Sequence, residues 1–110
     1  MITTHVLDLS SGKPGRGIAI ELEHAQNGIW HLVGGGVTDD DGRLRTLTTQ
    51  GPVPEGTYRI RFQTAPYFAA RQVDAFFPVV EIQFTVLDGT QHYHVPLLLS
   101  PFGFSTYRGS

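Results

Sequence analysis

Apolar and polar residues alternate along much of this chain, with the period of two that half-buried β-strands show. The clearest run covers residues 80–86, where four apolar side chains are separated by polar ones. Residues 18–23 and 57–62 follow the same period. Five further β-rich segments bring the prediction to about eight short strands: 4–9, 29–37, 43–47, 93–99 and 104–107.

Residues that favour turns separate the predicted strands. Asn27-Gly28 and Asp88-Gly89 predict tight hairpins, because these residue types tolerate positive φ. Only residues 65–75 predict a helix, and a proline stands near its start, where proline is favoured. Many short strands with one minor helix indicate an all-β sandwich or barrel built from antiparallel strands.

Length and composition narrow the class of protein. The 110 residues are expected to form a single domain that spans 1–110. A net charge of −2 argues against nucleic acid as a partner, and the absence of cysteine excludes disulfides and thiolate metal sites. No apolar run approaches the roughly 18 residues of a spanning helix, and residues 1–5 do not resemble a secretory signal. A cytoplasmic protein with no membrane partner is therefore expected.

Several polar features of the sequence are interpreted as structural and not as binding or catalytic sites. The three-glycine tract 34–36 precedes no helix and predicts a bulge or a close backbone approach. The acidic tract 39–42 lacks the alternating ligands of a calcium loop and predicts a solvated turn. His24 is expected to be exposed, and Arg59 and Arg61 are expected to carry surface charge.

The last nineteen residues hold most of the candidate chemistry. His92 and His94 are two positions apart on a predicted strand, so their side chains share a face. A tail that ends with Tyr107 and Arg108 is expected to be fixed in a site, and its carboxylate with it. Three imidazoles can hold a catalytic zinc ion, so His5 joined to the two histidines leaves a metal site open as an alternative.

Motifs along the whole chain resemble those of the transthyretin-like 5-hydroxyisourate hydrolases of urate breakdown. These motifs are His5-Val6-Leu7-Asp8 with Gly12-Lys13-Pro14, Thr38-Asp39 with Asp41-Gly42-Arg43, Phe76-Phe77-Pro78, residues 92–101, and Tyr107-Arg108-Gly109-Ser110. The last tetrapeptide separates the hydrolases from transthyretin, the related hormone carrier. Two residues depart from the family pattern: Gly15 and Phe104 stand where alanine and tyrosine are common.

This resemblance implies a transthyretin-like sandwich of two four-stranded antiparallel sheets with one short helix. It also implies a homotetramer, built as a dimer of dimers. The implied reaction is hydrolysis of 5-hydroxyisourate to 2-oxo-4-hydroxy-4-carboxy-5-ureidoimidazoline, with no metal and no cofactor. His5, Arg43 and His94 are implied to be catalytic. The residues implied to bind substrate are His5, Arg43, Tyr107, His92, Arg108, Gly109 and Ser110.

These residue types suit the opening of a cyclic amide by water. Imidazole titrates near neutral pH and can accept a proton from water, while arginine offers fixed donors to a developing oxyanion. Either His5 or His94 can be the base on this reasoning. Three alternatives remain: a non-catalytic carrier of a small aromatic ligand, a zinc hydrolase that uses His5, His92 and His94, and a structural β-sandwich module.

Overall fold

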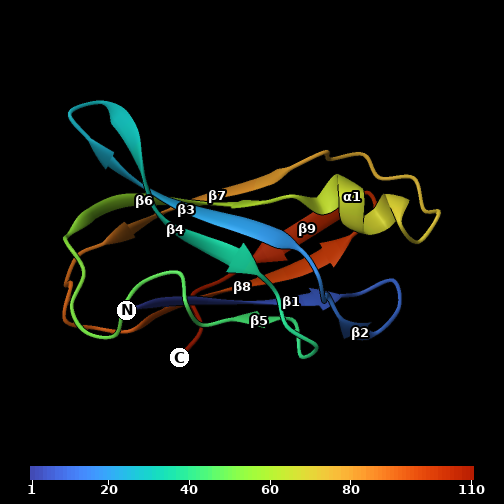
Figure 1. Cartoon of the computed structure of the whole chain (residues 1–110), viewed down its shortest axis with the longest axis horizontal. Coiled ribbons are helices and arrows are strands. Elements are labelled where there is room, and N and C mark those ends of the chain that lie inside the picture. Colours follow the sequence, from blue (N-terminus) through green and yellow to red (C-terminus); the bar gives the residue numbers. More distant parts are fainter.

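Two β-sheets stack face to face in the computed structural model, which describes all residues, 1–110 (Figure 1). The first sheet contains β1 (Ile2–Asp8), β2 (Lys13–Pro14), β5 (Arg43–Leu44), β8 (Tyr93–Ser100) and β9 (Gly103–Thr106). The second sheet contains β3 (Ala19–Gln26), β4 (Ile29–Val37), β6 (Gly56–Phe62) and β7 (Val80–Val86). One short helix, α1 (Thr64–Ala69), follows β6 at one end of the sandwich (Figure 1).

The first sheet is organised around β1. On one side β1 pairs in parallel with β8 along its whole length, and β9 continues the sheet beyond β8. On its other side β1 pairs first with β5 and then with β2, both antiparallel. The parallel pair places the first strand of the chain beside its last long strand. The two ends of the chain therefore lie at the same end of the molecule (Figure 1).

The predicted transthyretin-like sandwich of two sheets with one short helix is confirmed, but the expectation of four strands in each sheet with antiparallel pairing throughout is corrected in the first sheet. The first sheet has five strands, and its β1–β8 pair is parallel. The strand predicted at 43–47 is reduced to the two residues of β5. Asp88-Gly89 does not form a hairpin, because β7 and β8 belong to different sheets and the loop crosses between them.

The predicted helix is only partly formed, whereas the hairpin predicted at Asn27-Gly28 is present. The helix predicted at 65–75 is shorter, and the chain soon leaves helical geometry, with Gln72 at a φ of 58°. Asn27 and Gly28 form the predicted turn between β3 and β4 and both have positive φ, as a tight hairpin requires. No helix in the protein has the length and apolar character needed to cross a membrane.

The core lies between the two sheets and consists of 19 buried apolar residues. It follows the alternation of the strands: in β8, for example, Val95, Leu97 and Leu99 point inward. The opposite face of the first sheet is the one that matters for function. Residues in the alternate positions of β1 and β8 are directed outward, away from the core.

Three assignments from sequence are changed or refined. His24 is buried rather than exposed, because it stacks on Tyr58 with ring centroids 4.3 Å apart. Arg59 is mostly covered, since it binds Glu23 at 2.8 Å and lies over the ring of Trp30. Gly34 lies at an irregularity of the β3–β4 pairing and against the Leu47 carbonyl, so the prediction of a bulge with close backbone approach is confirmed.

Candidate functional site

The outer face of the first sheet collects most of the candidate residues. The strand register places Thr3 of β1 opposite His94 of β8 and His5 opposite Arg43 of β5. Thr3 and His5 are two positions apart, so they share the face that is directed away from the core. His92 precedes His94 by two positions and lies on the same side. Four of the predicted site residues are thus brought together by pairing between strands that are distant in sequence.

Thr3 connects the two neighbouring histidines. Its Oγ1 lies 2.8 Å from Nε2 of His92 and 2.8 Å from Nδ1 of His94. Thr3 is 5% exposed, whereas His94 is half-buried and His92 is exposed. The hydroxyl therefore holds the His94 ring through Nδ1, and no hydrogen bond within the chain involves Nε2 of that ring.

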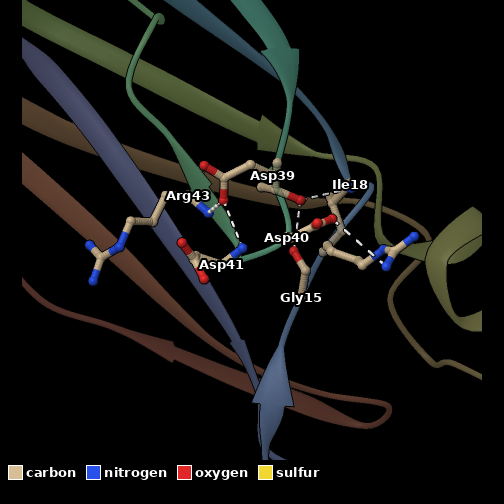
Figure 2. A network of polar contacts seen from close by, with 8 residues as sticks. Gly15, Ile18, Asp39, Asp40, Asp41 and Arg43 are labelled. Atoms are coloured by element: carbon tan, nitrogen blue, oxygen red, sulfur yellow. Dashed lines mark hydrogen bonds and ion pairs between the residues drawn. The ribbon is translucent and has the colours of Figure 1, made fainter.

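The turn from Asp39 to Gly42 holds the other half of the cluster. Oδ1 of Asp39 accepts hydrogen bonds at 2.9 Å from the backbone N–H groups of Asp41 and Arg43. Figure 2 shows that the Arg43 side chain extends away from this turn, so its backbone is held while its guanidinium is free of the network. The Asp41 carbonyl accepts a hydrogen bond of 3.0 Å from Nε2 of His5, which leaves Nδ1 as the free ring nitrogen of His5.

The predicted solvated turn at 39–42 is confirmed as a turn, and it has a positioning role that the sequence did not indicate. Gly42 has a φ of 75°, and a Cβ there would overlap the Val6 carbonyl oxygen. The hydrogen bond from the Arg43 N–H is the largest of the interactions that hold the pKa of Asp39 below its ordinary value. An ionised Asp39 therefore accompanies the ordered turn.

The electrostatic setting favours a neutral His94. Burial lowers the pKa of His94 from its ordinary value of 6.5, and the nearby positive charges of His5, His92 and Arg43 lower it further. A neutral imidazole with a free Nε2 is a proton acceptor at neutral pH. The guanidinium of Arg43 stays charged and can stabilise negative charge on a bound molecule.

A small cavity opens over this cluster. Its volume is about 220 Å³. It is lined by Met1, Thr3, Thr4, Arg43, Arg45, His92, His94 and Ser110. Because small-molecule pockets commonly range from about 300 to 1,000 Å³, one chain provides less enclosure than such a site needs.

Residues of the C-terminal tail line two different cavities. The Gly109 N–H donates a hydrogen bond of 2.7 Å to the His94 carbonyl, and Ser110 reaches the cavity. Arg108 instead lies over the ring of Tyr93. Together with Tyr107, it lines a separate cavity of about 450 Å³ beside β7. Within one chain, the structure therefore does not bring Tyr107 and Arg108 to the histidines.

Three residues at the cluster were missed by the sequence analysis: Thr3, Asp41 and Arg45. Thr3 and Asp41 act through a hydroxyl and a backbone carbonyl, for which the sequence carries no signal. Within the chain, the arrangement of His5, His92 and His94 does not support the zinc alternative. No three side chains of His, Asp or Glu converge so that they could hold a metal ion.

Comparison with known proteins assigns the family. The model of the HIUase/Transthyretin family matches residues 2–109. This chain belongs to that family. A probable 5-hydroxyisourate hydrolase from Caenorhabditis elegans is 47% identical over 109 residues, which cover 99% of this chain and 81% of that protein.

Both branches of the HIUase/Transthyretin family share the fold. The Klebsiella pneumoniae 5-hydroxyisourate hydrolase has a TM-score of 0.86 and 33% identity, covering 99% of this chain and 98% of its own. Sea bream transthyretin in complex with thyroxine has a TM-score of 0.91 and 32% identity, covering 98% and 93%. Fold similarity therefore does not separate hydrolase from carrier, and the polar cluster has to do so.

Proposed function

We infer that this chain is a 5-hydroxyisourate hydrolase of urate degradation. It adds water to a ring amide of 5-hydroxyisourate and yields 2-oxo-4-hydroxy-4-carboxy-5-ureidoimidazoline. The observation that carries this inference is sequence identity of 41–47% over nearly the whole chain to proteins named 5-hydroxyisourate hydrolase. A half-buried imidazole beside a guanidinium supports it, because a base and a cation are what amide hydrolysis requires.

We propose His94 as the general base. Its lowered pKa favours the neutral form, and its Nε2 has no partner in the chain and can accept the proton of an attacking water. Arg43 is proposed to stabilise the oxyanion that forms on the substrate. His5, held through Nε2 by the Asp41 carbonyl, is proposed to orient the substrate through Nδ1.

Tyr107 and Arg108 are proposed to complete the site in an assembly. Tyr107 lies at a separate cavity in its own chain, and one chain encloses only a small space over the histidines. We propose a homotetramer, a dimer of dimers, in which another copy closes the site. Exposed apolar side chains near β7 and β9, among them Leu87, Phe104 and Tyr107, support contact between copies. The cytoplasmic location stays a prediction.

The test is the rate at which freshly generated 5-hydroxyisourate loses its ultraviolet absorbance. The wild-type protein should accelerate ring opening far above the spontaneous rate. His94→Ala, His5→Ala and Arg43→Ala should each lower kcat, and loss of the base alone should cost about 10²–10⁴-fold. His31→Ala is the matched control, because His31 is exposed on β4 and outside the cluster.

Full activity in all three cluster variants would contradict the assignment of the site. A strong chelator should leave the rate unchanged, and a chelator-sensitive rate would favour the zinc alternative. The carrier alternative rests on the fold that this chain shares with the thyroxine-bound transthyretin. A saturable hydrolytic rate distinguishes an enzyme from a carrier, since a carrier binds its ligand without turnover.

A further inference from the structure

Thr3 is a buried hydroxyl placed between two imidazoles. Both distances from its Oγ1, to Nε2 of His92 and to Nδ1 of His94, are 2.8 Å, and both are within hydrogen-bond range. Parallel pairing of β1 with β8 sets this contact, since Thr3 lies directly opposite His94. Buried hydroxyls are normally satisfied by a backbone carbonyl or by water, so contact with two titratable rings is a specific arrangement.

The hydrogen-bond inventory restricts how the three groups can be protonated. A threonine hydroxyl carries one donor and can accept, while a neutral imidazole has one donor and one acceptor nitrogen. If His94 is the base, its Nε2 is unprotonated and its Nδ1–H donates to Thr3. The Thr3 O–H is then free to donate to Nε2 of His92, which makes His92 the Nδ1–H form. Thr3 thereby couples the tautomers of the two rings.

We propose that Thr3 is a positioning residue that holds His94 in its Nδ1–H form and relays a proton from His94 to His92 during hydrolysis. This proposal rests on the proposed function and adds to it a residue for which the sequence gave no signal. Thr3 acts through His94 and is not itself in contact with the reacting atoms.

The relay balances in protons. His94 takes a proton from water at Nε2 and becomes an imidazolium. It then passes the proton of Nδ1 to the Thr3 oxygen, while the Thr3 O–H proton moves to Nε2 of His92. His94 ends as the neutral Nε2–H form, Thr3 ends as a neutral hydroxyl, and His92 ends as the imidazolium. The reverse transfer returns the proton for release of the product.

The surroundings of the two histidines favour proton transfer from His94 to His92. His94 is half-buried and faces the positive charges of His5 and Arg43, so holding a charge there is unfavourable. Within the chain His92 is more exposed than His94, so a positive charge is less unfavourable on His92. The other charged groups on residues that line this cavity are Arg45, the amino group of Met1, which donates to the Gly51 carbonyl, and the terminal carboxylate of Ser110. The hydrogen bonds of the Thr3 hydroxyl go to His94 and His92, so His92 is the acceptor that a proton from His94 reaches through Thr3.

The experiment compares Thr3→Val, which removes the hydroxyl but keeps the branched shape, with Thr3→Ser, which keeps the hydroxyl. Thr3→Val should lower kcat by roughly 10- to 100-fold, the lower part of the range for proton transfer, with KM within about twofold. Thr3→Ser should stay within about threefold of wild type. Thr64→Val is the matched control, because Thr64 is also a buried threonine, and its hydroxyl donates to the Phe77 carbonyl away from the cavity.

A double-variant cycle separates a relay from simple support of the ring. If Thr3 and His92 act as one unit, Thr3→Val combined with His92→Ala should be no slower than the slower single variant. Multiplied effects would overturn the relay, because they would show independent roles. Equal losses in Thr3→Ser and Thr3→Val would also overturn it, because the hydroxyl would not be the element that matters.

Nitrogen NMR of the imidazoles tests the coupling without substrate, so it separates failure of this proposal from failure of the proposed function. Wild-type His94 should be in the Nδ1–H form when neutral, and Thr3→Val should change the tautomer populations of His94 and His92 together. A resting Nε2–H form of His94, or an unchanged spectrum in Thr3→Val, would overturn the proposal. Absence of ring opening in the wild type would instead overturn the proposed function.

Discussion

At the scale of single residues, the site depends on close contacts that tolerate little added volume. Gly109 donates its backbone N–H to the His94 carbonyl and packs against the imidazole of the same residue. A Cβ at position 109 would lie 2.7 Å from Cδ2 of His94, which is closer than carbon atoms normally approach. Glycine at this position thus lets the tail lie against the proposed base.

Gly109→Ala should therefore impair catalysis without unfolding the protein. The methyl group must displace either the tail or the His94 ring, and misplacement by about 1 Å can cost on the order of 10²-fold in rate. The measurement is kcat for ring opening together with the thermal midpoint of unfolding. Gly103→Ala is the control, because its Cβ would meet only Ser100 Oγ, at 3.9 Å. An unchanged kcat in Gly109→Ala would remove the tail from the mechanism.

At the scale of elements, a buried carboxylate joins the first sheet to the helix. Tyr67 of α1 donates a hydrogen bond of 2.6 Å to Oδ2 of Asp8, at the end of β1. Oδ1 of Asp8 accepts from the N–H and the hydroxyl of Ser10. Burial by itself would raise the pKa of Asp8, but the hydrogen bonds from Ser10 and Tyr67 outweigh it, and the pKa is lowered.

The same contact affects the pKa of Tyr67 in the opposite direction. Burial, followed by the hydrogen bond to Asp8, raises the pKa of Tyr67 to about 12. Ionised Asp8 therefore stabilises the fold above its unfolded pKa of 3.8, and this contribution is lost as pH falls through the lower folded value. Protonated Tyr67 stabilises the fold below its unfolded pKa of 10.0, and this contribution is lost as pH rises through about 12.

Tyr67→Phe should lower the free energy of unfolding by about 1–3 kcal/mol at neutral pH, because it leaves a buried carboxylate oxygen unpaired. Denaturant titrations at several pH values measure this. The difference from wild type should be constant from about pH 5 to 9 and should shrink in strong acid and strong base. Tyr58→Phe is the control, since Tyr58 donates to the Pro54 carbonyl and its loss should be independent of pH on the acid side. A difference that did not shrink in acid would contradict the role of Asp8.

At the scale of the whole molecule, the separation of Tyr107 from the histidines is the feature on which the proposed assembly rests. The two cavities lie in different parts of one chain: one is at the outer face of the first sheet, and the other is beside β7 and the tail. Catalysis that uses both His94 and Tyr107 therefore requires either a large movement of the tail or a second copy. The proposed homotetramer supplies the second copy.

Subunit mixing tests this arrangement. His94→Ala and Tyr107→Phe should each be nearly inactive alone, whereas hetero-oligomers assembled from both after unfolding and refolding together should regain part of the wild-type rate. Light scattering should give a mass about four times that of the 12.1-kDa chain. Leu87→Asp should lower both the mass and the activity, since Leu87 is 79% exposed and apolar beside the Tyr107 cavity. A fully active monomer, or mixtures without regained activity, would contradict sites shared between copies.

The sequence by itself determined most of the strands and the Asn27-Gly28 hairpin, because alternation and turn preference act between neighbouring residues. Its motifs also identified the family and named His5, Arg43, His92 and His94. It failed where distant segments meet. Burial of His24 depends on stacking against Tyr58, and the change of sheet at Asp88-Gly89 depends on which strands pair.

Only the tertiary structure decided the chemistry of the site. Parallel pairing of β1 with β8 places the Thr3 hydroxyl between two imidazoles that are 89 and 91 residues away in sequence. The turn at 39–42 brings a backbone carbonyl to His5, and burial sets the direction of the His94 pKa. These features arise from the register between strands. The alternation within a strand determines which of its faces is buried, but which distant strands pair is decided only when the whole core packs.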